Sequence, residues 1–328
     1  MNNQIQMKEG VLHAYLLDGQ GGGRDLSWPE IEDWNAAKGC LWLHFDYTDA
    51  AAQNWIRYQS GLESIISQAL LTEETRPRVA AIEDGLLIAL RGVNLNPDSN
   101  PEDMVSIRLW ADKNWVISTR KRKLLSTQDV LAKLQRGSGP KDTADLIVQL
   151  TDSIVWRMSD TVGVLEDKMA ELEDGSLSED RSTLRFELAT LRRQTISLRR
   201  YLSPQREALA RLLVEKVSWL DLDNQMKIRE VSDRLIRHLE DIDSVRERAA
   251  VTHEELLSRI SEQLNERMYV LSILSAIFLP LGFFTGLLGI NVGGIPGAEN
   301  PNSFMIFVGI LIVIVFFQLW LFKRKKWL

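Results

Sequence analysis

The chain has 328 residues, carries a formal net charge of −6 and contains a single cysteine. One cysteine excludes an intramolecular disulfide framework and fits a reducing compartment. An acidic chain argues against nucleic acid as a partner and favours cations. No nucleophile, base or metal triad stands out, so we expect neither an enzyme nor a bound cofactor.

The N-terminal part alternates short apolar strands with helical or turn segments, such as Trp55 to Leu71. Five strands are predicted: Val11 to Leu17, Leu41 to Asp46, Leu86 to Val93, Val105 to Trp110 and Trp115 to Ser118. Pro140 and the glycines just before it punctuate the chain, and the strand pattern stops there. We therefore predict a cytoplasmic α/β domain over residues 1–140 and an α+β class for the soluble part.

Beyond Pro140 the pattern is helical, with breaks only at Gly175 and near Trp219 to Asp223. Asp221 or Asp223 is the predicted N-cap of the last helix, which continues without proline or glycine as far as Pro280. Its apolar positions recur every three, four or seven residues among dense mixed charge. We predict a helical region over residues 141–267, with a long stalk helix that bundles with copies of itself. Packing as a hairpin on the preceding helix of the same subunit is the alternative, and both arrangements can hold together.

Two apolar runs, residues 268–290 and 304–322, contain no Asp, Glu, Lys, Arg or His. Each has the roughly 20 residues that a helix needs to cross a bilayer. Basic residues precede the first run and fill the tail at 323–328, whereas the loop at 291–303 has none. The bias of Lys and Arg toward the cytoplasm predicts a multi-pass protein with both termini inside and the loop at 291–303 outside, which is periplasmic if the membrane is the bacterial inner membrane. The first ten residues have no apolar core, so we expect no cleavable signal peptide.

One face of the first apolar run is small or weakly polar. Its members follow one another at spacings of three or four: Asn265, Met268, Ser272, Ser275, Leu279, Gly282, Gly286 and Gly289. Such a face indicates either close helix packing or a water-filled path. The second run is largely aliphatic and aromatic and is predicted to face lipid. Repeated around an axis, the first run would line a pore, and Pro280 would let it bend.

The loop between the two runs opens with Gly289-Ile290-Asn291. If several subunits bring this segment together, they supply a ring of asparagine and backbone carbonyls. Oxygen dipoles without formal charge suit a hydrated divalent cation, because they bind its water shell without stripping it. A Gly-x-Asn sequence is weak evidence alone, but its place at the end of a predicted span strengthens it.

Zinc prefers nitrogen and sulfur ligands, so histidine and cysteine were considered as metal ligands. Cys40 and His44 share one face of a predicted strand, where core packing is favoured over a two-ligand site. His238 and His253 lie on the stalk beside acidic residues and would bind zinc weakly between subunits, unless they belong to a solvated helix face. Neither predicted span holds a carboxylate or histidine that could relay protons.

Gly289-Ile290-Asn291 at the end of the first of two C-terminal spans, Pro280 eleven residues before Asn291, and a terminal Lys-Lys-Trp-Leu resemble the CorA superfamily of divalent metal-ion transporters. Longer segments are similar to the bacterial zinc transporters of its ZntB family. These segments are Gly289 to Gly297, Thr75 to Val79, Ser118 to Lys123 and Arg199 to Arg206. The resemblance spans almost the whole chain.

The resemblance implies a funnel-shaped homopentamer in the lipid of the bacterial inner membrane, with stalk helices that continue into a pore-lining ring. It implies zinc as the transported ion, with uptake coupled to protons, and Ni²⁺, Cd²⁺ or Co²⁺ as further cations. The family's selectivity filter maps onto Gly289, Ile290 and Asn291, and its pore-lining register maps onto the small-residue face.

Two departures from the family pattern bear on the ion. Ile290 stands where magnesium-type members usually have methionine, which argues against simple magnesium transport. Glu299 lies eight residues past Asn291, farther than the acidic residue of those members, so it is only a weak candidate for concentrating cations. A Mg²⁺/Co²⁺/Ni²⁺ channel, zinc efflux, and a membrane scaffold or sensor remain as alternatives.

Overall fold

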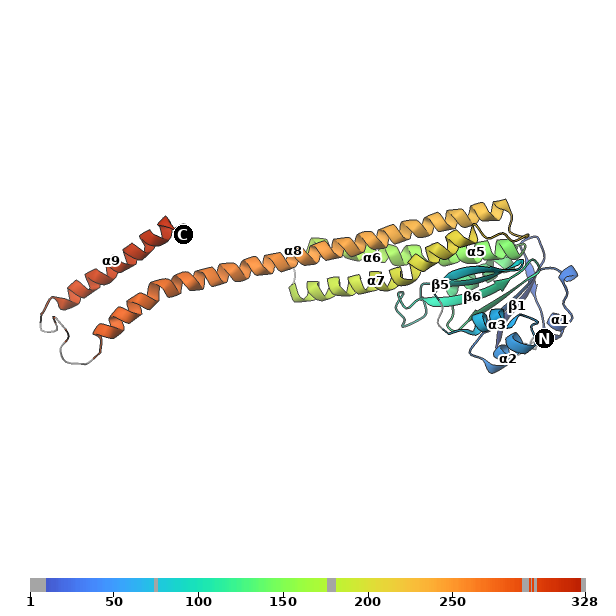
Figure 1. Ribbon diagram of the computed structural model, residues 1–328, viewed down its shortest axis with the longest axis horizontal. Helices are drawn as coiled ribbons and strands as arrows, with labels where there is room; N and C mark the ends of the chain where they lie inside the picture. Colours follow the sequence, from blue (N-terminus) through green and yellow to red (C-terminus); the bar gives the residue numbers. More distant parts are fainter. Residues whose placement is uncertain are drawn as a thin grey trace. The chain divides into compact units, whose positions relative to one another are not determined.

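The computed structural model describes residues 10–73, 76–175, 181–290, 295, 297 and 300–325. It divides into two compact units, Met1–His253 and Glu254–Leu328. The first unit holds a β-sheet and most of the helices, and the second holds the end of one long helix and the C-terminal helix (Figure 1).

The sheet has seven strands in the order β2-β1-β3-β7-β6-β5-β4. They are β1 Val11–Leu17, β2 Gly23–Asp25, β3 Leu41–Asp46, β4 Arg78–Ile82, β5 Gly85–Gly92, β6 Val105–Ala111 and β7 Trp115–Arg120. Strands β3 and β7 pair in parallel, and the other pairs are antiparallel. The five predicted strands are present. The two that were not predicted, β2 and β4, are the edge strands.

The helices are α1 Trp28–Glu32, η1 Ala36–Lys38, α2 Ala50–Tyr58, α3 Ser64–Leu71, α4 Leu125–Gln135, α5 Thr143–Trp156, α6 Met158–Gly175, α7 Arg181–Leu212, α8 Leu222–Leu288 and α9 Ser303–Arg324. The segment from Trp55 to Leu71, predicted as helical or turn structure, holds the end of α2, a turn and the whole of α3. Gly61, between α2 and α3, has a φ of 73°, which glycine adopts readily and which a helix cannot contain.

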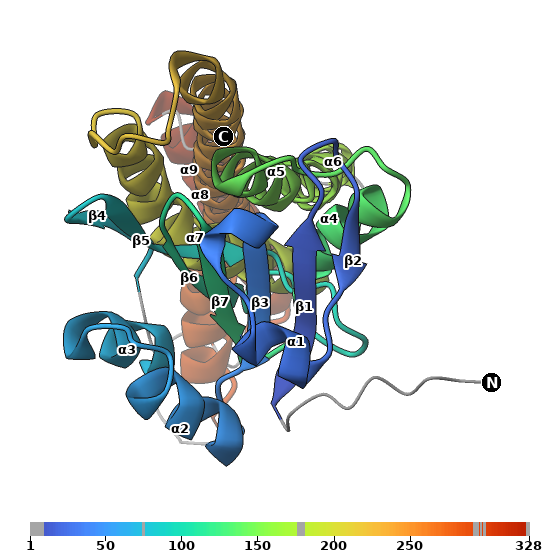
Figure 2. The ribbon, with the colours of Figure 1, turned by 90° about the vertical axis from the view of Figure 1, so that its right-hand side faces the viewer.

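Helices cover both faces of the sheet, as Figure 2 shows, with α2 and α3 on one side and α4 and α5 on the other. On the α2 side, Phe45 of β3 stacks on Trp55 of α2 with ring centroids 5.1 Å apart. On the opposite side, Cys40 next to β3 contacts Thr143 of α5. Because successive side chains of a strand point to opposite faces, both faces of β3 are buried.

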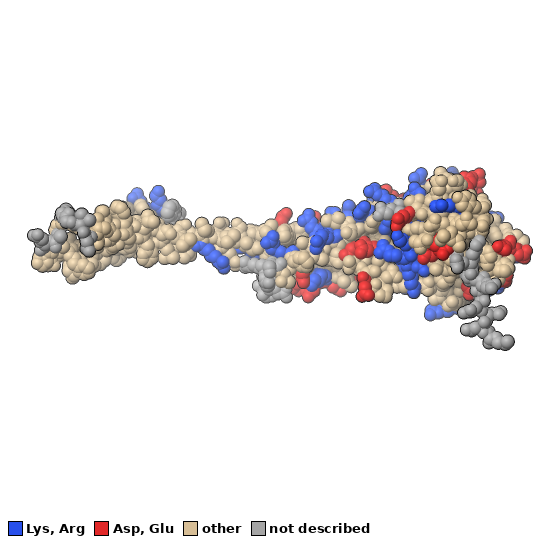
Figure 3. Space-filling view, turned by 90° about the horizontal axis from the view of Figure 1, so that it is seen from below, with Lys and Arg blue, Asp and Glu red and all other residues tan. Residues whose placement is uncertain are grey.

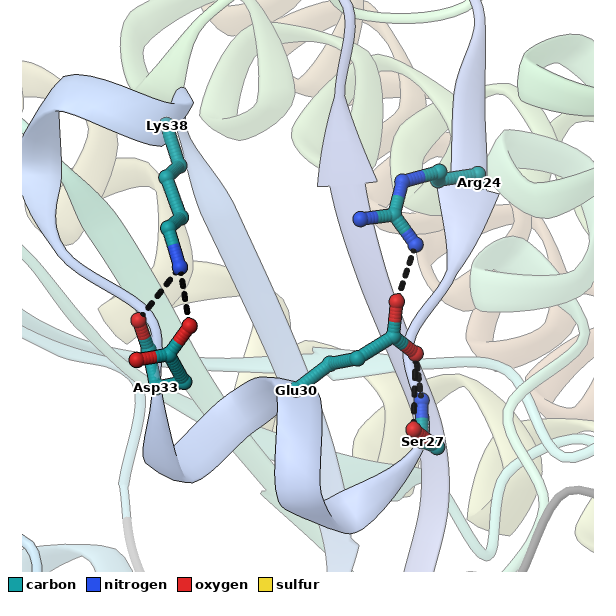
Figure 4. A network of polar contacts seen from close by, with 5 residues as sticks. All are labelled: Arg24, Ser27, Glu30, Asp33 and Lys38. Atoms are coloured by element: carbon teal, nitrogen blue, oxygen red, sulfur yellow. Dashed lines mark hydrogen bonds and ion pairs between the residues drawn. The ribbon is translucent and has the colours of Figure 1, made fainter.

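A polar network fastens the turn between β2 and α1 (Figure 4). Ser27 precedes α1, and its backbone N and Oγ donate to Glu30 Oε2 at 2.8 and 2.7 Å. Arg24 Nη1 donates to Glu30 Oε1 at 2.7 Å. The bonds from Ser27, then the one from Arg24, lower the pKa of Glu30 to about 2. Nearby, Lys38 Nζ donates to the Asp33 carbonyl at 2.7 Å.

Helix α8 begins with the cap that the sequence predicts. Asp221 Oδ1 accepts a hydrogen bond from the Asn224 backbone N at 2.8 Å, so Asp221 rather than Asp223 is the N-cap. From residue 228 to residue 249 the apolar stripe of α8 is buried within the chain: Ile228, Val231, Leu235, Leu239, Ile242, Val245 and Ala249. Leu264, further along the same stripe, is exposed. Intrachain packing, the alternative given for the stalk, therefore covers the stripe between Ile228 and Ala249.

Ion pairs join α8 to three other helices of the first unit. Arg234 Nη1 lies 2.7 Å from Asp152 of α5, and Arg199 Nε of α7 lies 2.7 Å from Asp243. Arg248 Nε donates to Glu173 of α6 at 2.9 Å. These pairs are partly exposed, and each therefore contributes little to stability beside the buried apolar stripe.

Candidate ion path

The second unit contains two helices that are long and apolar enough to cross a membrane, the end of α8 and the whole of α9. Figure 3 shows charged side chains spread over the first unit and a largely uncharged surface over these helices. The charged side chains of α9 are Lys323 and Arg324, in its last turn. A polar backbone can stay in hydrocarbon only when its hydrogen bonds are made internally, and helices meet that condition.

One face of α8 contacts α9. Ile273, Ala276, Ile277, Pro280 and Leu281 are partly buried there, at the spacing of one helix face. A hydrogen bond links the helices, since Gln318 Nε2 donates to the Ala276 carbonyl at 3.1 Å.

Most of the predicted pore-lining residues lie away from this face, on average about 140° around the helix at 3.6 residues per turn. Ser272 and Gly282 lie nearer to α9, because each borders a groove that α9 also lines. All seven, Asn265, Met268, Ser272, Ser275, Leu279, Gly282 and Gly286, are exposed. A Cβ atom added to Gly282 or Gly286 would meet no described atom within 4 Å. Packing against α9 of the same chain therefore does not require a glycine at either of these two positions.

The serine hydroxyl in the middle of this face is oriented by its own helix. Ser272 Oγ donates to the Met268 carbonyl one turn earlier, at 2.7 Å. Because the hydroxyl proton is used there, the lone pairs of the oxygen remain to accept hydrogen bonds. An acceptor of this kind suits the water shell of a cation, whose hydrogens point outward.

At the end of α8, Gly289 permits a backbone arrangement that other residues would disturb. Its backbone N donates to the Thr285 carbonyl at 2.9 Å, and an added Cβ would lie 2.7 Å from that same oxygen. Ile290 follows with half of its surface exposed. The other predicted residues of the mouth, Asn291 and Glu299, lie outside the described residues.

The stalk histidines do not form a metal centre within the part of one chain that the structure describes. His238 is 8% exposed, with Nε2 3.3 Å from Ser159 Oγ, and burial is the main cause of its lowered pKa. His253 is partly buried, at the end of the first unit. Among the described residues, no group of three or more His, Cys, Asp or Glu side chains gathers to hold a metal.

Cys40 and His44 are packing residues, as the sequence favoured. His44 is fully buried, with Nδ1 2.7 Å from Ser118 Oγ, a hydroxyl that Trp42 Nε1 also contacts at 2.8 Å. Burial, and then Arg120, hold the pKa of His44 well below its usual value. Cys40 Sγ lies 3.2 Å from Thr143 Oγ1, and burial raises the pKa of the thiol to about 11. A protonated thiol is a poor zinc ligand.

Sequence reasoning missed Gln318. It is a carboxamide in a run that we predicted to face lipid, and the structure turns it toward α8. Two features of the sequence could have predicted its contact with α8: Gln318 is the one amide in an otherwise apolar span, and the other span contains a proline, Pro280.

Comparison with known proteins shows the family. A family model described as "CorA-like Mg2+ transporter protein" matches residues 37–324. The divalent cation transporter CmaX of Pseudomonas aeruginosa is 40% identical over 324 residues, which cover 98% of each chain. The zinc transport protein ZntB of Pectobacterium carotovorum subsp. carotovorum is 39% identical over 319 residues, 97% of this chain and 96% of the relative.

A solved structure agrees with these sequence matches. The structure of full-length CmaX aligns with a TM-score of 0.85 at 39% identity, covering 98% of this chain and 99% of that one. The relatives are named as transporters, which agrees with the expectation of no enzyme. With its soluble α/β part, long helix and two C-terminal apolar helices, the chain belongs to the CorA-like family.

Proposed function

We propose that this protein is a divalent-cation transporter that carries zinc inward across the bacterial inner membrane, coupled to protons, as a homopentamer. The observation that carries the proposal is the exposed small-residue face of α8, where an added Cβ at Gly282 or Gly286 meets no described atom and which ends at Gly289. Five such faces around an axis make a path lined by small residues and hydroxyl oxygens, with α9 toward the lipid.

The lining favours a hydrated ion. The Ser272 oxygen keeps its lone pairs for the ion's water. The ring of Gly289, Ile290 and Asn291 at the mouth contributes dipoles without formal charge. A path without formal charge binds a divalent cation weakly enough for it to leave. Glu299, His238 and His253 are proposed only as weak contacts for the metal outside this path.

Zinc is proposed because the ZntB relative is named as a zinc transporter and because Ile290 replaces the methionine usual in magnesium-type members. The second candidate function is a Mg²⁺/Co²⁺/Ni²⁺ channel, which the description of the matching family model favours. The two candidates differ in the ion that moves and in the effect of a proton gradient.

The membrane potential favours inward movement. One charge crossing 100 mV is worth about 2.3 kcal/mol, so a divalent cation gains about 4.6 kcal/mol, roughly three orders of magnitude in concentration. Efflux would have to work against this gradient. Since the runs 268–290 and 304–322 contain no carboxylate or histidine, proton coupling would involve the soluble unit or the hydrated ion itself.

The test is zinc flux into proteoliposomes with and without an imposed proton gradient, for the natural protein, Asn291→Ala and Asn302→Ala. Asn302 is the matched control, an asparagine that precedes α9 and makes no side-chain cap. We expect flux that rises with external acidity, is lost in Asn291→Ala and is retained in Asn302→Ala.

Other outcomes decide between the alternatives. If magnesium moves while zinc does not, and a proton gradient has no effect, the protein is the channel of the second candidate. If zinc moves only outward, the efflux alternative holds. If no divalent cation moves in the natural protein, transport itself is refuted and a scaffold or sensor takes its place.

A further inference from the structure

Pro280 creates a hydrogen-bonding defect in the first span. A helix closes its backbone bonds from the N–H of one residue to the carbonyl four residues earlier. Proline has no N–H, so the Ala276 carbonyl loses its regular partner although α8 continues through this point. In hydrocarbon no water is present to replace that partner, and an unsatisfied carbonyl is costly.

The second span supplies a donor to the same atom. Gln318 Nε2 donates to the Ala276 carbonyl at 3.1 Å, and the amide is partly buried between the helices. The orientation of the amide follows from chemistry, because its own oxygen cannot bond to another carbonyl oxygen. Gln318 Oε1 is buried and has no partner among the described residues. Among the described residues, the hydrogen bond to the Ala276 carbonyl is therefore the one that the Gln318 amide makes in its apolar surroundings.

We propose that Gln318 is a positioning residue of the ion path, which replaces the backbone bond that Pro280 removes and joins the two spans at that point. Gly282, Gly286 and Gly289 all follow the proline, so the course of the helix at Pro280 sets where they lie. By contrast, hydroxyls in the same span donate within their own helix, as Thr285 Oγ1 does to Leu281 at 2.9 Å.

The test is a double-mutant cycle on the full-length protein in lipid nanodiscs and proteoliposomes. Gln318→Met keeps the length of the side chain and removes the donor, and Pro280→Ala restores the backbone N–H. We expect Gln318→Met to weaken the folding equilibrium about threefold, and at most about twentyfold, as measured for interhelical hydrogen bonds in membranes. In the Pro280→Ala background the same substitution has no further effect, because the Ala276 carbonyl already has a partner.

Thr285→Val is the matched control. It removes a polar group from the same span whose bond does not depend on the proline, so its effect is equal in both backgrounds. If Gln318→Met does not yield folded protein, Gln318→Asn takes its place in the double-mutant cycle. Its side chain is one methylene shorter, so the amide donor no longer reaches the Ala276 carbonyl. A Gln318 effect that is the same with Pro280 and with alanine at that position overturns the proposal.

A second readout is zinc flux, and this part rests on the proposed function. We expect Gln318→Met to lower flux when Pro280 is present and to leave flux unchanged in the Pro280→Ala background. The two proposals fail separately. Coupled effects on the folding equilibrium, without zinc movement in any variant, would refute zinc transport and leave the positioning role. Zinc flux with uncoupled effects on the folding equilibrium would refute only the positioning role.

Discussion

Gly282→Leu tests whether the exposed face of α8 is a path for ions. The matched control is Gly309→Leu in α9, the span proposed to face lipid. An added Cβ at either glycine meets no described atom within 4 Å, so the single chain has room for the first atom of both new side chains. The two variants carry the same chemical change and differ only in which helix face receives the side chain.

The expected sizes differ between folding and flux. Replacing a helical glycine by a good helix former adds about 0.8 kcal/mol of helix stability, so neither variant is expected to melt below the natural protein. In the proposed path, Gly282→Leu adds a branched apolar side chain from every subunit and forces the ion to shed water. A barrier higher by only about 1.4 kcal/mol lowers the rate tenfold. We therefore expect at least a tenfold loss of flux for Gly282→Leu and none for Gly309→Leu.

The measurement is zinc uptake into proteoliposomes at matched protein content, with the melting temperature recorded on the same preparations. Equal flux in the two variants would refute the assignment of this face to the path. A melting temperature that falls in Gly282→Leu alone would show instead that the face packs closely against another helix, the alternative to a water-filled path.

Three further predictions concern the helix ends and the core. Gly289→Ala should lower both the melting temperature and the zinc flux, since its Cβ would lie 2.7 Å from a carbonyl oxygen. Gly286→Ala, the control, should keep the melting temperature of the natural protein, and equal melting temperatures in the two variants would contradict the prediction. Asp221→Ala should lower the free energy of unfolding by about 1 kcal/mol in urea titration, as the loss of an N-cap does. Asp223→Ala, the control, should change it less, and the reverse order would show the wrong cap. The natural protein should lose thermal stability below pH 6.5, because His44 binds a proton in the unfolded chain but not in the folded one, where burial lowers its pKa. His44→Gln should make this loss smaller, and an unchanged dependence of melting temperature on pH would contradict the prediction.

The fold was predictable where burial leaves a pattern. The five inner strands are largely apolar, with β3 and β5 buried along almost their whole length, and each was predicted from its apolar run. Strand β2 has three residues, Gly23–Asp25, with no apolar alternation, and β4 is a short edge strand. Such strands are held by pairing with a neighbour, which one segment of sequence does not reveal.

The site was predictable only as far as one helix allows. Helical spacing identifies the small-residue face of α8, but it does not say which face meets α9. The role of Gln318 depends on its contact with Ala276 of the other helix, a residue 42 positions away in the sequence. Similarly, Asp221 and Asp223 both satisfy the sequence rule for a cap, and only the backbone geometry selects Asp221.

The partly buried, protonated thiol of Cys40 makes the natural chain suitable for chemical mapping. With a pKa of about 11, roughly one thiol in ten thousand is ionised at pH 7, and only the thiolate reacts quickly with maleimides or methanethiosulfonates. It is also the one cysteine of the sequence. Cysteines introduced singly along α8 can therefore be labelled against a silent background, and the positions that react from water would trace the wetted side of the helix directly.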